Sequence, residues 1–239
     1  MAWDTEILFS NIVLVGSFNP AIFSPAWLAK NDVISEDEAN AAEEPVTHPQ
    51  VAQISIEHLT ITVETNKFMV RYASDPAVRS LDIVVQIFKD LLPHTPISAF
   101  GINYGEHWRT ETPQQRLALG RALAPLEPWG EWGATFDDDD PQMVGGMSAL
   151  VMKKPFSPKG TGENILTGYR RAEISPSTEI PDQLRAVLVG TNHHREFVVD
   201  TARGALPAIE LAIEEFDGAI MAAKKIIQQI KDFAKGMPT

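Results

Sequence analysis

The longest regular pattern of apolar residues lies near the C-terminal end of the chain, between residues 205 and 235. Its apolar or small residues recur at intervals of three and four, at Leu206, Ile209, Ile213, Phe216, Ile220, Ala223, Ile227, Ile230 and Ala234. This spacing places them on one face of an α-helix and fits no strand. Acidic residues gather in the first half and lysines in the second, which complements the helix dipole. The sequence therefore predicts one long amphipathic helix, which ends before Gly236 and Pro238.

The apolar runs before this helix are shorter and have the character of β-strands. Residues 12–15 are continuously apolar, and residues 59–64 alternate aliphatic side chains with threonine, as in a half-buried strand. Further strands are expected at 51–57, 68–73, 97–104, 147–152, 165–174 and 184–189, with another short one at 196–200. Amphipathic patterns predict helices at 75–92 and after Thr112.

The order of these elements predicts an α+β fold. Strands and helices do not alternate as in a βαβ protein, and short turns between consecutive strands favour antiparallel pairing. We expect antiparallel sheet in two halves, each a meander followed by a helix, with the long C-terminal helix packed on the sheet. The predicted boundaries are an N-terminal half at 1–125, a connector rich in Trp and Asp at 126–142, and a C-terminal half at 143–239. One continuous domain is the alternative.

Composition narrows the range of partners. The chain of 239 residues carries a net charge of −12 and has no cysteine. The missing thiols exclude disulfides and Cys-ligated zinc. The negative charge disfavours binding to nucleic acid or to anionic membrane surfaces. No apolar run reaches the roughly 20 residues of a membrane span, and the start of the chain lacks the basic leader of a signal peptide. A cytoplasmic location without membrane association is expected.

Two short motifs suggest a family. One is Gly101-Ile102-Asn103-Tyr104, which closes the run that starts at Leu59. The other is Phe18-Asn19-Pro20 with Phe23-Ser24-Pro25-Ala26-Trp27. These stretches resemble a sporadically distributed bacterial family of uncharacterised proteins. The resemblance implies a bacterial, soluble α+β protein, and it carries over no activity, cofactor or catalytic residue.

Polar residues at predicted strand ends form a candidate pocket. They are Asn103, Tyr104, His107 and Arg109 in one half, and His193, His194 and Arg195 in the other. Such groups commonly fix ligands, so a pocket between the sheet and the long helix is one hypothesis. The other interpretation is that residues 192–196 form a polar turn leading into the long helix. No metal-binding spacing is present, and Asp137–Asp140 are typical of a solvated loop, so we assign no metal ligand and no cofactor.

A cluster of basic residues flanks the loop at residues 160–162. It consists of Lys153, Lys154, Lys159, Arg170 and Arg171. If the two flanking strands form a hairpin, these charges gather into a candidate anion patch for a phosphate, an acidic partner or nucleic acid. The loop lacks the spacing of a P-loop, and a solvated hairpin end is the simpler interpretation.

The predicted C-terminal helix has two interpretations as well. Its apolar stripe suits either a partner helix or the sheet of its own chain. We expect the first half to pack on the sheet and the second half to project toward a partner, through Ile220, Lys224, Ile227, Ile230 and Lys231. The sequence thus predicts a non-catalytic interaction protein, a subunit or partner in a bacterial assembly or a homo-oligomer. The alternatives are a small-molecule- or metal-binding protein or enzyme, and a protein that contacts nucleic acid through the basic hairpin.

Overall fold

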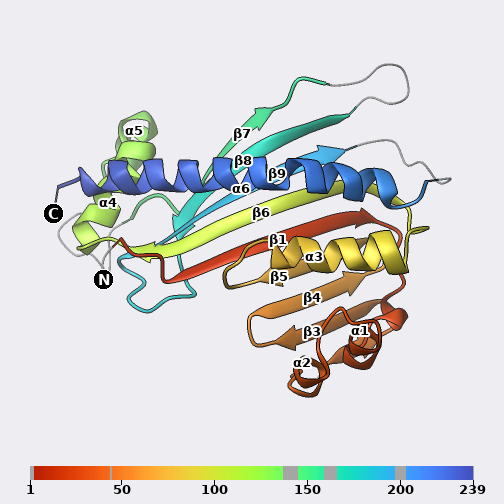
Figure 1. Ribbon diagram of the computed structural model, residues 1–239. Coiled ribbons are helices and arrows are strands. Elements are labelled where there is room, and N and C mark those ends of the chain that lie inside the picture. Colours follow the sequence, from red (N-terminus) through yellow and green to blue (C-terminus); the bar gives the residue numbers. More distant parts are fainter. Residues whose placement is uncertain (1–2, 44, 137–144, 159–165, 197–202, 239) are drawn as a thin grey trace.

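A computed structural model describes residues 3–43, 45–136, 145–158, 166–196 and 203–238 (Figure 1). Its strands are β1 (Ile7–Gly16), β2 (Val46–His48), β3 (Val51–Ile56), β4 (Leu59–Glu64), β5 (Lys67–Tyr72), β6 (Ile97–Arg109), β7 (Leu150–Pro155), β8 (Thr167–Pro176) and β9 (Ala186–Glu196). Its α-helices are α1 (Pro25–Lys30), α2 (Glu36–Asn40), α3 (Arg79–Val85), α4 (Pro113–Leu123), α5 (Gly130–Gly133) and α6 (Leu206–Lys235). Short helical turns are η1 (Pro20–Ile22), η2 (Gln86–Leu91) and η3 (Glu127–Trp129).

The described strands form one nine-stranded sheet in the order β2-β3-β4-β5-β1-β6-β9-β8-β7. Every neighbouring pair is antiparallel. The centre consists of β1, β6 and β9, in which Asn11 pairs with Asn103 and Asn103 pairs with Asn192. Strands that lie far apart in the sequence are therefore direct neighbours.

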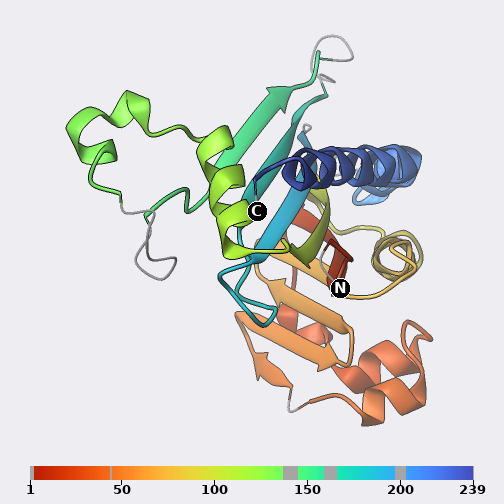
Figure 2. The same ribbon diagram turned by 90° about the vertical axis from the view of Figure 1, so that its left-hand side faces the viewer.

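Helices α6 and α3 pack on the same face of this sheet (Figures 1 and 2). The long helix α6 crosses β6 and β9, and α3 lies beside it over β1 and β5. Side chains alternate between the two faces of a strand, so Ile12 and Leu14 of β1 point toward the helices and are fully buried. Ile102 and Tyr104 of β6 do the same. The hydrophobic core lies between this face of the sheet and the helices.

The long helix predicted from the apolar stripe is confirmed, with Pro207 in its first turn and Gly236 after its last residue. Ile209, Phe216 and Ile220 of the stripe are buried against the sheet. Ile213 is instead 42% exposed, while Ala212 beside it is completely buried. The helix is thus rotated so that a small residue makes the close contact with the sheet at this turn.

The predicted α+β class is also confirmed, together with its two meander-plus-helix halves. In the first half, β1 is followed by α1 and α2, the meander β2–β5 and helix α3. Strand β6 and helix α4 complete the N-terminal half, and the C-terminal half consists of the meander β7–β9 followed by helix α6. Because β6 pairs with β9, the sheet runs without a break from one half into the other.

The structure corrects two local predictions. Residues 192–196 do not form a turn but complete β9, which is a single strand. They pair with β6 on one side and β8 on the other, and α6 supplies a carboxylate for His193 and Arg195. The second half of α6 does not project from the molecule either, since Ile227, Lys231 and Ala234 are buried against the chain itself.

Two further segments contain short helices. The acidic segment after Ser35 forms α2, which begins with a capping box between Ser35 and Glu38. The connector at 126–142 contains η3 and α5, and its aspartates at 137–140 lie outside the described residues. Within the described part of the chain, no helix has the length and apolar character needed to cross a membrane.

Candidate functional site

Three asparagines form a row across the centre of the sheet, on the face opposite α6. Asn11, Asn103 and Asn192 come from β1, β6 and β9 and are directly paired in the strand register. Their neighbours along each strand, such as Ile12, Ile102 and His193, point to the helices and are buried. The row is therefore a direct result of strand alternation. We call the side of the sheet that carries it the open face, because α6 and α3 cover the other side (Figure 2).

Glycines beside the row leave space for these carboxamides. A Cβ on Gly101 would lie 3.2 Å from the Asn192 Nδ2 atom and 3.7 Å from the Asn103 Nδ2 atom. Both side chains therefore lean over Gly101, and a Cβ there would crowd the Asn192 carboxamide. Gly190 differs, because a Cβ there would meet no atom within 4 Å. The strand backbone at Gly190 thus borders empty space.

That space is a groove of about 380 Å³ on the open face. Its volume lies within the range of known ligand sites, roughly 300–1,000 Å³. It crosses four neighbouring strands and is lined by Phe9, Asn11, Val13, Val15, Gly101, Asn103, Arg171, Glu173, Leu188, Gly190, Thr191, Asn192 and His194. Aliphatic side chains and carboxamides thus share one surface, which suits hydrogen bonding and apolar contact together.

The carboxamides in the groove have unused hydrogen-bonding capacity. The Asn192 Oδ1 atom is buried and has no partner among the described residues. The Asn103 Nδ2 group donates only long bonds to Asn11, of 3.3 Å to its carbonyl oxygen and 3.5 Å to its Oδ1 atom. Burying a polar atom without a partner costs free energy, so a ligand that paired with these groups would gain affinity.

Ionisable groups on the open face are instead paired within the chain. Arg171 donates to Glu173, His194 contacts Glu196 at 2.8 Å, and Arg71 reaches Glu179 at 3.0 Å. The Lys153 ammonium lies 3.7 Å from the centre of the Tyr169 ring. The uncharged carboxamides are therefore the polar groups of this groove that lack strong partners.

Under α6, the opposite face of β9 carries a compact charged cluster centred on Glu215. Its carboxylate accepts two hydrogen bonds from Arg195, of 2.8 and 2.6 Å, and lies 2.7 Å from the His193 Nε2 atom. Arg170 lies 3.1 Å from the other ring nitrogen of His193. Because a guanidinium only donates, His193 accepts at Nδ1 and donates to Glu215 from Nε2. The cluster ties three strand residues to the helix.

The pKa values in this cluster follow from burial and pairing. Burial lowers the pKa of His193, and Arg170 and Arg195 act in the same direction, against the opposing effect of Glu215. For Glu215, burial acts to raise the pKa, but the hydrogen bonds from Arg195 and His193 outweigh it and lower the pKa. The cluster therefore contains a neutral histidine and an ionised carboxylate.

A second polar cluster lies nearer the end of α6. Lys231 donates to Glu106 at 2.7 Å and to Thr5 at 2.9 Å, and Tyr104 donates to Glu106 at 3.2 Å. Burial and the neighbouring carboxylate raise the pKa of Tyr104. Burial acts against ionisation of Glu106, but Lys231 and Thr5 outweigh it and lower its pKa. Both clusters fix α6 to the sheet by paired buried groups.

The residues of the predicted pocket are divided between the two faces of the sheet. Tyr104, His193 and Arg195 lie under α6 and are packed and hydrogen-bonded there. Asn103 and His194 lie on the open face, in the groove. A pocket between sheet and helix therefore stays a prediction for Tyr104, His193 and Arg195. Asn103 and His194 instead line the groove on the open face.

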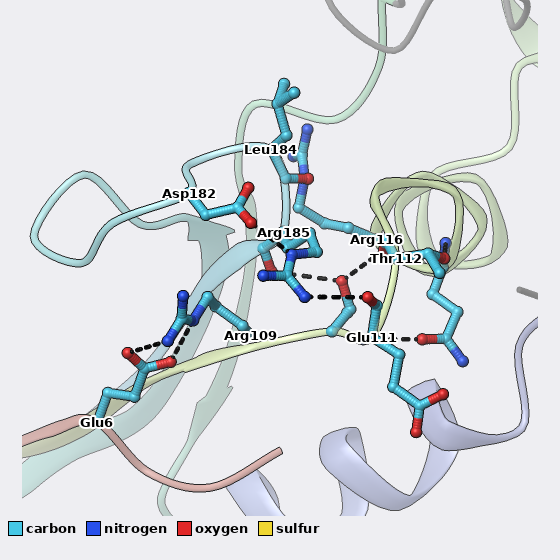
Figure 3. A network of polar contacts seen from close by, with 10 residues as sticks. Glu6, Arg109, Glu111, Thr112, Arg116, Asp182, Leu184 and Arg185 are labelled. Carbon is cyan, nitrogen blue, oxygen red and sulfur yellow. Dashed lines mark hydrogen bonds and ion pairs between the residues drawn. The ribbon is translucent and has the colours of Figure 1, made fainter. Parts of the chain in front are cut away.

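His107 and Arg109 make structural contacts instead. The His107 Nδ1 atom lies 2.7 Å from the Ser177 hydroxyl, and burial lowers the pKa of His107. Arg109 pairs with Glu6 through two hydrogen bonds. Figure 3 shows this pair beside a network in which Arg185 bonds Asp182 and the Glu111 carbonyl, and Arg116 bonds the Leu184 carbonyl. These contacts join the ends of β6 and β9 to α4.

The predicted partner surface on α6 is largely used within the chain. Ile220, Ile227 and Lys231 are buried, and Ile230 is partly buried. Lys224 is exposed, with its ammonium 5.4 Å from the centre of the Tyr104 ring. The apolar stripe is therefore occupied by the sheet, and only the outer side of the helix is accessible.

The predicted anion patch does not form one surface. Lys153 pairs with Arg171 in the register of β7 and β8, and Lys154 pairs with Arg170. The first pair points to the open face and the second to the face of α6, where Arg170 contacts His193. Lys159 lies outside the described residues. The charges are thus separated by the sheet itself.

A second cavity of about 240 Å³ lies between α4 and β8, lined in part by Arg116, Leu119, Met147 and Ile174. One wall, at residues 145–147, follows directly on residues that the structure does not describe. We therefore base no site on it. In the described ranges, no three His, Asp or Glu side chains are grouped as metal ligands would be.

Comparison with known proteins adds no family and no relative, because no protein-family model and no curated protein sequence matches this chain. The bacterial family resemblance stays a prediction.

The groove was only partly foreseen, since Asn103 was a candidate but Asn11 was not. The available indication was Asn11 itself, a polar residue of β1 that directly precedes the apolar run at residues 12–15.

Proposed function

We propose that this chain is a non-catalytic interaction protein that binds a partner protein through the groove of its open face. The observation that carries the proposal is the row of Asn11, Asn103 and Asn192, which lines that groove with incompletely bonded carboxamides. The groove lies on the face opposite α6 and α3, and its hydrogen-bonding groups beside aliphatic side chains have the mixed character of protein interfaces.

The outer side of α6 is the competing surface. It carries exposed apolar side chains at Ile213, Met221 and Phe233, but their spacing forms no continuous stripe. Single exposed apolar residues are normal on soluble proteins. The groove is the better candidate because its polar groups lack partners, whereas the helix has already buried its apolar stripe.

Two glycines allow a matched test of the two surfaces. Gly190 lines the groove and Gly218 lies exposed on α6, and a Cβ at either position would meet no atom within 4 Å. Gly190→Phe should therefore fill the groove, and Gly218→Phe should add the same side chain to the helix surface. Both variants are expected to fold, which thermal unfolding of the purified proteins would check.

The measurement is affinity capture of a stoichiometric partner by the tagged full chain in its own host, followed by mass spectrometry and light scattering. We expect the wild type and Gly218→Phe to retain the same partner and Gly190→Phe to lose it. Loss only in Gly218→Phe would place the interface on α6 and refute the proposal. A folded Gly190→Phe that keeps the partner would refute it as well.

A further inference from the structure

We infer that the groove recognises an uncharged, extended polypeptide segment by hydrogen bonds to its main-chain amides, through Asn11, Asn103 and Asn192. This inference rests on the proposed function and specifies what part of the partner is bound. Three properties of the groove support it: the chemistry of its polar groups, their arrangement, and the absence of a spare charge among its described residues.

The chemistry of the polar groups matches that of a peptide bond. Each carboxamide offers two N–H donors and one carbonyl acceptor, and a peptide bond offers one of each. The unpaired Asn192 Oδ1 atom needs a donor, and the weakly bonded Asn103 Nδ2 group needs an acceptor. In an extended chain the N–H and the C=O of one residue point to the same side, so one residue passing the two side chains supplies both.

The arrangement is linear rather than convergent. The three asparagines are cross-strand neighbours, so they repeat at the strand spacing of about 4.8 Å. Small-molecule sites usually direct a few polar groups toward one point. A row of identical groups suits a ligand that repeats its own hydrogen-bonding groups along its length, and a polypeptide chain does so.

The ion pairs among the side chains that line the groove disfavour a strongly charged ligand. Arg171 and His194 line the groove, and each is paired with a glutamate of the same strand, Glu173 and Glu196. An anionic ligand would have to break these pairs and would meet the glutamates. Aliphatic side chains at Val13, Val15 and Leu188 provide contact for uncharged side chains of the segment.

Selection of binders from a random dodecapeptide display library on the purified full chain tests this inference. The enriched peptides are then synthesised with and without N-methylation of individual main-chain amides, and their affinity is measured by fluorescence polarisation. Asn103→Leu and Asn192→Leu remove carboxamides of the row. Gln53→Leu is the matched control, because Gln53 is an exposed carboxamide on the same face of the sheet but outside the groove.

We expect enriched peptides poor in charged residues, with affinities that change little between low and high salt. N-methylation at one or two central positions should weaken binding roughly 3- to 10-fold each, the usual effect of one lost hydrogen bond. Asn192→Leu should weaken binding by a similar factor, while Gln53→Leu leaves it unchanged. N-methylation alters the peptide alone, so this arm remains decisive if an asparagine variant fails to fold.

Three outcomes would overturn the inference. They are a library that yields no binder, binders whose affinity is unaffected by N-methylation, and charged binders with steep salt dependence. None of these outcomes decides the proposed function, because that is tested separately by the loss of the captured partner in Gly190→Phe. Loss of the partner in that variant, with no peptide selected, would show an interface of another chemistry at the same groove.

Discussion

At the scale of single residues, Glu215 has the largest consequences. It is the carboxylate that faces two buried or partly buried arginines, Arg195 and Arg170, and its own side chain is 13% exposed. Removing one partner of a buried ion pair leaves an uncompensated buried charge. This lowers the free energy of unfolding more than replacing both partners by apolar residues would. One glutamate of α6 thus determines whether the polar part of β9 stays under the helix.

Glu215→Gln should therefore lower the free energy of unfolding by about 3 kcal/mol or more. The glutamine keeps the shape and part of the hydrogen bonding but removes the charge. Glu210→Gln on the same helix is the control, because Glu210 pairs with Arg203 while both side chains are more than half exposed. That change should alter the free energy of unfolding by less than about 1 kcal/mol. Urea denaturation of both variants measures the difference, and equal effects would contradict the prediction.

His193 makes the stability depend on pH. Burial lowers its pKa in the folded protein, with Arg170 and Arg195 acting in the same direction and Glu215 opposing them. The unfolded chain therefore binds more protons below about pH 6.5, and the free energy of unfolding decreases as the pH falls through that range. The stabilisation is complete above the ordinary histidine pKa and is lost progressively below it.

Urea denaturation at pH 5.0 and 7.5 measures this dependence. His193→Gln keeps one donor and one acceptor but does not titrate, so we expect a smaller loss of stability between the two pH values than in the wild type. Some loss should remain, because burial also lowers the pKa of His107. If His193→Gln and the wild type lose the same free energy, the assignment of a neutral His193 is wrong.

At the scale of elements, α6 packs its apolar stripe against the sheet of its own chain. Ile227 is 1% exposed and packs against the sheet, so Ile227→Ala should cost about 2–5 kcal/mol of unfolding free energy. Ile213→Ala, at a position 42% exposed, should cost less than about 1 kcal/mol. Thermal and urea unfolding compare the two. A substitution at Ile227 that disrupts assembly but leaves stability intact would contradict this assignment.

At the scale of the whole molecule, the continuous sheet predicts a single cooperative unit. β6 lies within residues 1–125, yet its residues 99–109 pair with β9 and α6 covers it. Residues 1–125 alone would leave β6 paired with β1 but without β9 and α6, and would expose Ile102 and Tyr104, which are buried in the full chain.

We therefore expect residues 1–125 to lack a cooperative unfolding transition, and the full chain to show one transition by both circular dichroism and tryptophan fluorescence. The full chain is the control for expression and purification. Two separate transitions in the full chain, or a cooperative transition in the isolated half, would show that the halves are independent domains.

Much of the fold could be predicted from local patterns. The α6 helix, the alternating strand β4 and the helix caps at Ser24 and Thr112 each follow from spacing or residue type within a few positions. The same patterns were misleading at β9, because Asn192-His193-His194-Arg195 lacks apolar residues. These residues form a strand because β6 and β8 pair with them on both sides, and Glu215 of the distant helix α6 provides a partner for His193 and Arg195.

The sequence by itself determined the periodic elements and the α+β class, since periodicity depends on neighbours along the chain. The tertiary structure decided the register of β1, β6 and β9, and hence the row of Asn11, Asn103 and Asn192. It also decided that His193 lies under α6 and that His194 lies in the groove. The physical reason is that strand pairing and helix docking join residues that are distant in sequence, and the alternation of side chains then assigns each one to a face.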